Sequence, residues 1–161
     1  MKTVICVDLE GKQHEVEANE LRWRPSAYAV VIHSGKLLLA KEASGSYSLP
    51  GGGIELGELP QDAVLREVKE ETGIIVAHPK PLSFASNFFA LTGSSKGKYV
   101  ESLLLYYRCE FVGGELSLQY LPAVDRPFHD APEWLPLEQL GNIKLASSFD
   151  WRPLVQSLTV S

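Results

Sequence analysis

The amino-acid sequence predicts a single mixed α/β domain over residues 1–161. Three observations lead to this class: the length suits one domain, short apolar segments alternate with glycine- and proline-containing turns, and one segment has helical periodicity. Hydrophobic residues make up 45% of the chain and charged residues 22%, which is typical of a folded soluble protein rather than a disordered one. A chain of this length can bury a substantial core.

Short strands joined by turns are expected in the first third of the chain. Residues 3–17 are predicted to form a hairpin that turns near Gly11. The next strands are predicted in "AYAVVIH", entered by way of Pro25, in "LLLAK", and in "SYSLP", which ends at Pro50. The triplet Gly51, Gly52 and Gly53 is predicted to be a loop whose backbone can approach a ligand closely.

One helix and two long extended segments are expected next. Residues 59–72 have helical character, with Pro60 suited to the first turn and Gly73 to the position after the helix end. The later elements are an extended region from Ile74 with a bulge or edge at Pro79 and Pro81, a strand over residues 99–112, a loop over residues 119–132, a strand end and helical turn in "EWLPLEQLG", and a closing helix in "SFDWRPLVQSL".

Charge, cysteine usage and hydropathy argue against several classes of protein. The net charge of −5 disfavours a nucleic-acid polymer or an anionic membrane as the partner, because both select basic surfaces. Cys6 and Cys109 lie far apart and the four histidines show no zinc spacing, so we expect reduced thiols in a cytoplasmic protein. The apolar runs are far shorter than the ~20 residues that cross a bilayer, and Asp8 and Glu10 interrupt any signal-peptide core.

The segment "REVKEETG" concentrates negative charge on one side of the predicted helix. Glu67, Glu70 and Glu71 fall within an arc of about 100° on a helical wheel. Like charges at this spacing destabilise a helix by about 0.2–0.5 kcal/mol per pair, so the arrangement implies a positive partner in front of it. The neighbouring apolar stripe, which can anchor the helix on a sheet, consists of Val64, Leu65 and Val68.

Carboxylates upstream of and within the helix add to this acidic group. Glu55 and Glu58 lie in the segment that leads into the helix. Arg66 stands one turn from both Asp62 and Glu70, and we expect it to hold these carboxylates by charge-assisted hydrogen bonds. A set of oxygen ligands without His or Cys suits a hard divalent cation, above all Mg²⁺ or Mn²⁺.

Residues 52–74 resemble the Nudix box, G-x5-E-x7-R-E-U-x-E-E-x-G-U, where U is a bulky aliphatic residue. All nine specified positions match: Gly52, Glu58, Arg66, Glu67, Val68, Glu70, Glu71, Gly73 and Ile74. The segments "SLPGGGIE" and "EWLPLEQL" also resemble the family, so we divide the chain into an N-terminal hairpin extension, residues 1–24, and a Nudix core, residues 25–160. The resemblance implies an α/β/α sandwich around a mixed β-sheet and metal-dependent hydrolysis of a nucleoside diphosphate linked to another moiety.

The resemblance also implies roles for the residues of the box. Mg²⁺ or Mn²⁺ would be bound by Glu58, Glu67, Glu70, Glu71 and the backbone carbonyl of Gly52. Arg66 would orient the glutamates for catalysis. One carboxylate should act as the general base that takes a proton from water. Glu67 is the first choice for the base and Glu71 the second, and a base from a loop stays open, with Glu101, Asp125 and Asp130 as candidates.

Candidate substrate contacts are less sharply defined than the metal ligands. Gly52 and Gly53 can bring the backbone close to the substrate, and Lys41 at the end of "LLLAK" can reach a phosphate. Tyr120 and Phe128 fall in loop-like sequence and are candidates to stack on a base. Further candidates for phosphate contacts are Lys96 and Lys98. Arg22 and Arg24 are interpreted as surface residues, with a clamp on a substrate terminus or on a second subunit as the alternative.

The expected substrate is a small nucleotide, above all a (deoxy)nucleoside triphosphate. Residues that mark hydrolases of ADP-ribose, dinucleoside polyphosphates and NADH are absent downstream of the box, which favours the MutT-like group. The alternatives are an ADP-ribose or nucleotide-sugar hydrolase, a nucleotide-sensing Nudix domain without catalysis, and an isoprenoid diphosphate isomerase on the same fold. Because the strands of the N-terminal hairpin can pair across a two-fold axis, we also expect a homodimer.

Overall fold

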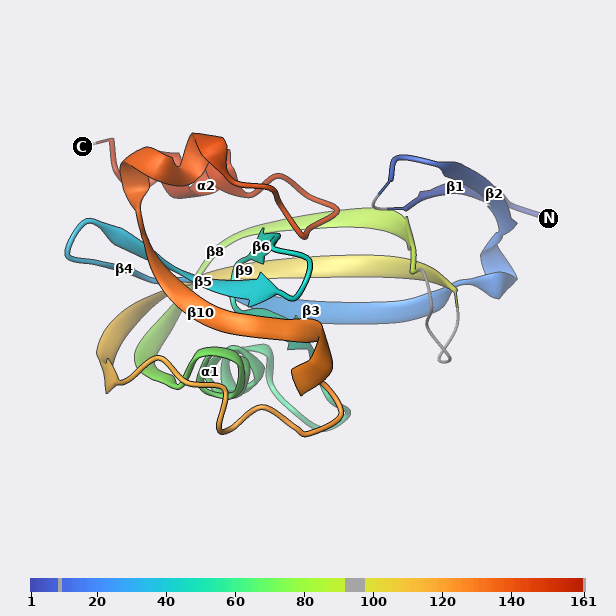
Figure 1. Ribbon diagram of the computed structural model, residues 1–161. Helices are drawn as coiled ribbons and strands as arrows, with labels where there is room; N and C mark the ends of the chain where they lie inside the picture. Colours follow the sequence, from blue (N-terminus) through green and yellow to red (C-terminus); the bar gives the residue numbers. More distant parts are fainter. Residues whose placement is uncertain (9, 92–97, 161) are drawn as a thin grey trace.

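The chain folds into strands of very different length, with one α-helix on each side of them (Figure 1). The computed structural model describes residues 1–8, 10–91 and 98–160. The strands in these residues are β1 (Thr3–Val7), β2 (Gln13–Glu17), β3 (Arg22–Val30), β4 (Ile32–His33), β5 (Lys36–Glu42), β6 (Tyr47–Ser48), β7 (Gly51–Gly53), β8 (Ile74–Ala90), β9 (Tyr99–Gly114) and β10 (His129–Pro136). The helices are α1 (Pro60–Thr72) and α2 (Arg152–Ser157), with 3₁₀ turns at Ala18–Glu20, Arg126–Phe128 and Leu137–Asn142.

The strands form two sheets. The larger sheet has the order β2-β1-β8-β9-β3-β7 and is mixed. Strand β3 runs parallel to β9 and β1 runs parallel to β8, whereas β8 runs antiparallel to β9 and β7 runs antiparallel to β3. The smaller sheet has the order β10-β5-β4, and β6 pairs with β5. The register of β8 on β9 shifts around Pro79 and Pro81, as the sequence predicts for a strand that carries two prolines.

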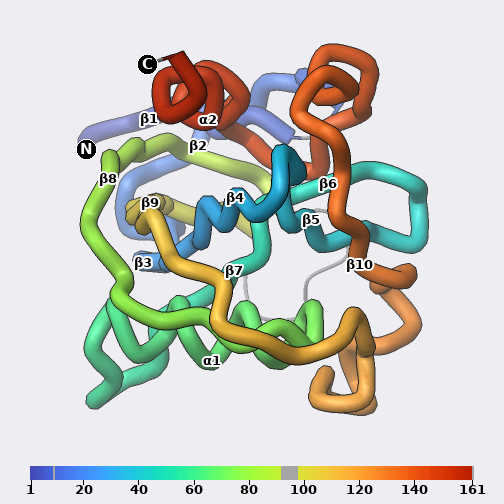
Figure 2. The backbone as a smooth tube through the Cα atoms, turned by 90° about the vertical axis from the view of Figure 1, so that its left-hand side faces the viewer, coloured from blue at the N-terminus to red at the C-terminus, as the bar shows by residue number. Residues whose placement is uncertain are grey.

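Two apolar cores separate the layers. In the first, Val64 and Val68 of α1 pack against Ala27, Ala29 and Tyr107 of the larger sheet. Both valines are fully buried, and each burial contributes about 1.5–3 kcal/mol to the free energy of unfolding. The second core joins the two sheets to α2. Figure 2, viewed from one end, shows α1 and α2 on opposite sides of the strands. The mixed α/β class and the α/β/α layering are confirmed.

The glycine triplet differs from its prediction. Gly51, Gly52 and Gly53 form strand β7 and pair with β3 instead of forming a loop. The prediction was wrong because glycine has low strand propensity, whereas here the absence of side chains allows the close approach to β3 that is described below. Strand β3 also begins at Arg22, so Pro25 and the boundary between residues 24 and 25 lie inside it. The end of the loop predicted over residues 119–132 is likewise already strand, because β10 begins at His129.

The N-terminal hairpin extends the larger sheet at one end of the molecule (Figure 1). Gly11 has a φ of +82° in its turn, and β1 contacts β8 through the parallel pair Val7–Phe89. Strand β2 is the outermost strand of the sheet, so its outer edge is unpaired within the described residues. No helix in the described part of the chain is long and apolar enough to span a membrane.

The homodimer stays a prediction, and the edge of β2 is the surface on which it depends. An unpaired strand edge presents backbone N–H and C=O groups that a second copy can pair with across a two-fold axis. We expect multi-angle light scattering at micromolar protein concentration to give twice the chain mass. The variant Glu15→Pro, at an exposed position of β2 whose N–H points away from β1, should give the single chain mass if β2 forms the interface, whereas a monomeric parent protein would contradict the prediction.

Candidate active site

Helix α1 displays the carboxylates because its ends are well defined and its apolar side is buried. Pro60 occupies its first turn, where a missing N–H costs nothing. Gly73 ends the helix with a φ of +76°, and its N–H donates to the carbonyl of Lys69 at 2.9 Å. The predicted boundaries of this helix are confirmed. Val64 and Val68 lie in the core, and the half-buried glutamates Glu67, Glu70 and Glu71 lie at its edge.

Arg66 joins three glutamates. Its guanidinium donates to both carboxylate oxygens of Glu58 at 2.7 and 2.9 Å, to Glu67 at 2.9 Å and to Glu70 at 3.2 Å. It also donates to the carbonyl of Gly53 at 3.2 Å, which ties the helix to strand β7. Two parallel bonds to one carboxylate are the strongest arrangement available to arginine. The prediction that Arg66 holds Glu70 is confirmed.

The other predicted partner of Arg66 was wrong. Asp62 is exposed, and the bonds of Arg66 within the described residues go to Glu58, Glu67, Glu70 and Gly53 instead. The spacing of one helical turn brings Arg66 near both Asp62 and Glu70, but the loop before α1 folds back and presents both oxygens of Glu58 to the guanidinium. A bidentate partner outcompetes a single oxygen of an exposed aspartate.

Strand β7 lies directly against the acidic side of α1. The backbone N–H of Gly51 donates to Glu71 at 3.0 Å. A Cβ at Gly52 would lie 2.7 Å from the Oε1 atom of Glu67, so a side chain there would displace this carboxylate from its position. The structure therefore brings together Glu58, Arg66, Glu67, Glu70, Glu71 and the glycines of β7, as the sequence motif predicts.

The carboxylates of this group differ in their electrostatics. The hydrogen bonds from Arg66 hold the pKa of Glu58 below its ordinary value. Burial raises the pKa of Glu67 in spite of its bond to Arg66, and it raises the pKa of Glu71 strongly. The charges of Glu67 and Glu70 raise the pKa of Glu71 further. The four carboxylates of the group thus have only two guanidinium groups near them, that of Arg66, which binds three of them, and that of Arg24, whose charge acts on Glu67.

These residues fit the divalent cation that the sequence predicts. The donors are carboxylate and backbone oxygens, which Mg²⁺ and Mn²⁺ prefer, and the raised pKa values of Glu67 and Glu71 indicate that a further positive charge would be favourable. Within the described residues, no three His, Cys, Asp or Glu side chains are gathered into a ready metal-binding group. The ion pairs with Arg66 hold the carboxylates of Glu67 and Glu70 at 2.9 and 3.2 Å from its guanidinium.

Two further charged residues lie near the site. The sequence analysis did not single out Glu42, and it interpreted Arg24 as a surface residue with a clamp on the substrate as the alternative. The charge of Glu42, at the end of β5, raises the pKa of Glu71. The charge of Arg24 lowers the pKa of Glu67, and the guanidinium of Arg24 donates to the hydroxyl of Ser26 at 2.8 Å. The alternation of side chains along strands β5 and β3 could have pointed to these two residues. It does so only when one knows which face of each strand points toward α1.

The predicted substrate contacts lie at several places around this site. Lys41 forms an ion pair with Glu133 at 2.7 Å, so its ammonium group is already partnered. Tyr120 is 47% exposed and carries the ammonium of Lys69 over its ring at 4.9 Å. Phe128 is 65% exposed. The roles of Lys41, Tyr120 and Phe128 in substrate binding stay predictions.

The remaining candidates are also spread out. The ammonium of Lys98 lies 5.3 Å from the ring centre of Tyr99, and Lys96 is outside the described residues. Among the candidate loop bases, Glu101 lies within β9, and Asp125 precedes the 3₁₀ turn Arg126–Phe128. Asp130 is exposed and accepts a hydrogen bond from the N–H of Ala131 at 2.8 Å. None of the three forms a bond to α1 within the described part of the chain.

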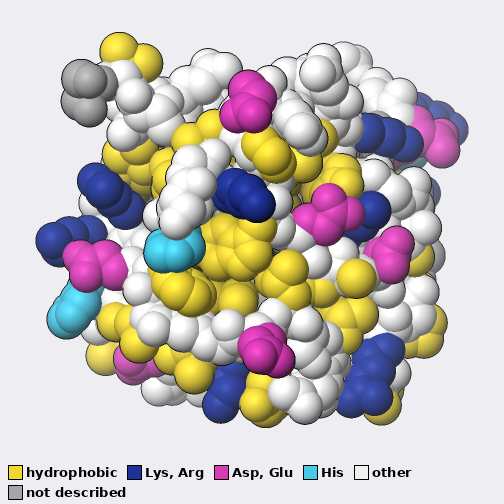
Figure 3. All heavy atoms as spheres, turned by 60° about the vertical axis from the view of Figure 1, so that its left-hand side comes forward, with side chains coloured by type: hydrophobic (Ala, Val, Ile, Leu, Met, Phe, Trp, Pro, Cys, Tyr) yellow, Lys and Arg dark blue, Asp and Glu magenta, His cyan; other side chains and the backbone are white. Residues whose placement is uncertain are grey.

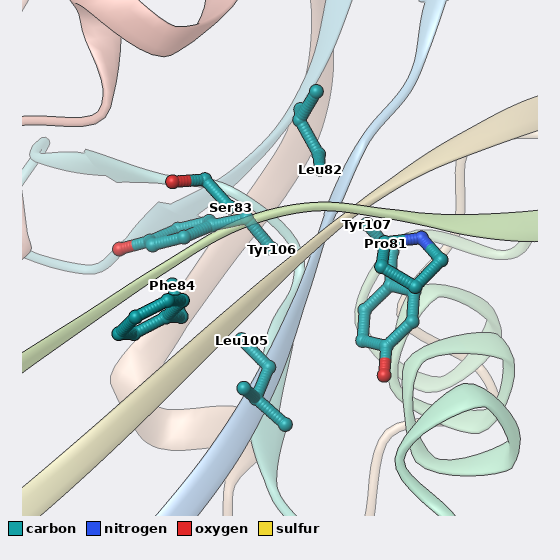
Figure 4. A pocket seen from close by; sticks show the side chains of 7 residues that line it. All are labelled: Pro81, Leu82, Ser83, Phe84, Leu105, Tyr106 and Tyr107. Carbon is teal, nitrogen blue, oxygen red and sulfur yellow. The ribbon is translucent and has the colours of Figure 1, made fainter.

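The hollows of the surface lie away from the carboxylates. One, of about 270 Å³, is formed by Pro81–Phe84 of β8 and Leu105–Tyr107 of β9 (Figure 4). Another, of about 150 Å³, contains His33, Arg108 and Phe111. Figure 3 shows a face on which hydrophobic side chains gather and acidic side chains stand apart from one another. None of the predicted site residues lines either hollow.

Comparison with known proteins gives a family and a fold. A model of the NUDIX domain matches residues 22–156. The ADP-ribose pyrophosphatase of Methanocaldococcus jannaschii is 33% identical over 92 residues, which cover 55% of this chain and 51% of that protein. The RNA pyrophosphohydrolase of Rhizobium meliloti is 30% identical over 141 residues, covering 76% of this chain and 84% of that protein.

A solved structure has the same fold. The MutT protein from Bacillus halodurans aligns with a TM-score of 0.65 at 24% identity, covering 86% of this chain and 83% of that one. The chain spans about half the length of several curated relatives that it matches. Because the family model covers most of the chain, including the complete motif from Gly52 to Ile74, the protein belongs to the NUDIX hydrolase family.

Proposed function

We propose that this chain is a Mg²⁺- or Mn²⁺-dependent pyrophosphohydrolase that cleaves a nucleoside diphosphate linked to another group. The observation that carries the proposal is the assembly of Glu58, Glu67 and Glu70 on the guanidinium of Arg66, with Glu71 of the same helix bound to the N–H of Gly51 in strand β7. A diphosphate is densely negative, so a group of carboxylates can face it only through cations. When bound, such a cation would neutralise phosphate charge and lower the pKa of a nearby water.

Each residue of the group has a role in this proposal. Glu58, Glu67, Glu70, Glu71 and the carbonyl of Gly52 would hold the cation. Arg66 keeps the glutamates in position and compensates part of their charge when no cation is present. The charge of Arg24 acts on Glu67, and in this proposal its guanidinium contacts a phosphate oxygen. In-line phosphoryl transfer depends mostly on such positioning and charge stabilisation.

Glu67 is the proposed general base, and Glu71 is the second choice. In the hydrolytic step the base takes a proton from water, the water oxygen bonds to phosphorus, and the phosphorus bond to the bridging oxygen breaks. Both carboxylates belong to the group that would hold the cation, so either one would lie beside a water activated there. Glu67 is preferred because its carboxylate lies against the backbone of Gly52, whose carbonyl is a proposed ligand of the same cation.

A small nucleotide, above all a (deoxy)nucleoside triphosphate, is the proposed substrate. The net charge of −5 disfavours a long polyanion, and the carboxylates lie outside the two hollows. The relatives named above favour two alternatives. One is ADP-ribose, and the other is the 5′ end of an RNA, for which the Rhizobium meliloti protein supplies the stronger argument because it aligns along most of its length.

A substrate screen tests the proposal. The full chain is incubated with Mg²⁺ or Mn²⁺ and with deoxynucleoside triphosphates, ribonucleoside triphosphates, ADP-ribose, a nucleotide sugar or a 5′-triphosphorylated RNA, and the phosphorus-containing products are identified. We expect turnover on a nucleoside triphosphate, abolished by excess EDTA. Turnover confined to ADP-ribose or RNA would replace the proposed substrate. Binding of nucleotides without turnover of any of them would favour a sensing domain and contradict the proposal.

A further inference from the structure

On one face of strand β5, a row of buried apolar side chains ends in the carboxylate of Glu42. Leu38 and Ala40 are buried, and because side chains alternate along a strand, Glu42 projects from the same side of β5 as they do. Leu38 belongs to the same apolar cluster as Val64 and Val68 of α1. This side of β5 therefore faces the helix that carries the acidic group.

On one side of helix α1, a row of buried apolar side chains likewise ends in a carboxylate, that of Glu71. Glu71 follows Val68 by three residues and Val64 by seven, so helical periodicity places all three on one side of α1. The rows on β5 and α1 pack against each other through their apolar members. Their polar ends, Glu42 and Glu71, consequently come together at the edge of the core. In accordance with this, the charge of Glu42 contributes to the raised pKa of Glu71.

The two carboxylates lack a sufficient counter-charge within the described residues. Glu71 accepts one hydrogen bond, from the N–H of Gly51. Neither carboxylate takes part in the ion pairs of this region, which use Arg66 and Lys41 with other glutamates. Both carboxylates are half-buried, and the residue opposite Glu42 in the strand pairing is His129. Like charges that are partly buried without compensation destabilise a folded protein, which favours binding of a cation between them.

We infer that Glu42 is a further cation-binding carboxylate of this site and acts together with Glu71. The inference rests on the proposed function, because the cation is the Mg²⁺ or Mn²⁺ of that proposal. Glu42 lies outside the contiguous sequence motif, which begins ten residues further on at Gly52. Strand β5 thus supplies one wall of the site, opposite α1, and the space between Glu42 and Glu71 would hold positive charge before any substrate arrives.

A competing explanation is that Glu42 serves only as the partner of His129. The two residues are directly opposite each other in the antiparallel pairing of β5 with β10. Cross-strand neighbours of opposite charge stabilise a sheet modestly. If this were the whole role of Glu42, removal of His129 would have the same effect on the protein as removal of the Glu42 charge.

Direct measurement of Mn²⁺ binding distinguishes these explanations without substrate or turnover. Metal-free full chain is titrated with MnCl₂, and free Mn²⁺ is followed by electron paramagnetic resonance. We expect Glu42→Gln to weaken Mn²⁺ binding by about tenfold or more. The matched control Glu110→Gln, an exposed glutamate of strand β9, and the variant His129→Gln should stay within about twofold of the parent protein.

Thermal unfolding provides a second readout and a control for folding. In EDTA, Glu42→Gln should unfold at the same or a higher temperature than the parent chain, because it removes a repulsion. Added Mn²⁺ should raise its unfolding temperature by less than it raises that of the parent. A lower unfolding temperature in EDTA, or an equal effect of Mn²⁺ on both proteins, would overturn the inference.

The outcomes also separate this inference from the proposed function. If Glu70→Gln weakens Mn²⁺ binding while Glu42→Gln does not, the inference fails and the proposed function stands. Equal weakening by Glu42→Gln and His129→Gln would show that Glu42 acts through His129, which also overturns the inference. If the parent protein binds no Mn²⁺ and hydrolyses no nucleotide, the proposed function itself fails.

Discussion

Replacing Glu70 by Gln lowers pyrophosphohydrolase activity by about 100-fold or more at saturating Mg²⁺. A bound cation contributes several kcal/mol of charge stabilisation in such reactions, and each 1.4 kcal/mol corresponds to tenfold in rate. The bond between Arg66 and Glu70, at 3.2 Å, is the longest of those that Arg66 makes to carboxylates, and a glutamine oxygen can still accept it. The fold should therefore stay intact, with an unchanged circular dichroism spectrum.

The control for this prediction is Asp62→Asn on the same helix. Asp62 is exposed, and among the described residues its carboxylate takes no part in the ion pairs around Arg66. We expect kcat and KM of this variant within about twofold of the parent values, as is usual for an exposed surface substitution. Glu70→Gln with full turnover in Mg²⁺ would exclude Glu70 as a metal ligand, whatever substrate is used.

Replacing Gly51 by Ala destabilises the protein by about 3 kcal/mol or more, which is at the upper end for added volume in a packed site. Gly51 has a φ of +156°, and a Cβ there would overlap the carbonyl oxygen of Ala27 and would lie 2.6 Å from the Cα of Tyr28. Since both are backbone atoms, relief requires β7 to move away from β3. That movement would also break the bond from the Gly51 N–H to Glu71.

Urea unfolding followed by tryptophan fluorescence measures this effect, because Trp151 is buried and will respond to loss of the core. Gly53→Ala is the matched control within the same strand. A Cβ at Gly53 meets only the guanidinium of Arg24, at 3.9 Å, so its free energy of unfolding should change by less than about 1 kcal/mol. Equal stability of the two variants would show that β7 is not held tightly on β3.

The helix and its charge pattern were predictable because they depend on neighbours in the sequence. Pro60 and Gly73 mark the ends of α1, and the spacing of Val64 and Val68 identifies its buried side. These are local rules of backbone geometry and side-chain direction. The acidic group followed from the same spacing, as did the salt bridge from Arg66 to Glu70.

Other hydrogen-bond and ion-pair partners could not be predicted from neighbouring residues in the sequence. The bidentate bond of Arg66 goes to Glu58 in the preceding loop, and its bond to Gly53 reaches another strand. Lys41 looks available in the sequence, yet Glu133 of β10 binds its ammonium at 2.7 Å. In each of these pairs, the partner is brought near by the course of the chain, which residue periodicity does not describe.

The sequence by itself determined the family motif, the mixed α/β class, the helix that carries the glutamates and the oxygen-only character of the candidate ligands. All of these depend on residue types and on spacings within one element. Only the tertiary structure decided that three glycines form a strand on β3, that Arg66 binds Glu58, and that the Leu38 side of β5 packs against α1. The reason is physical: which face of a strand meets a helix depends on how the sheets stack, and long-range packing sets that stacking.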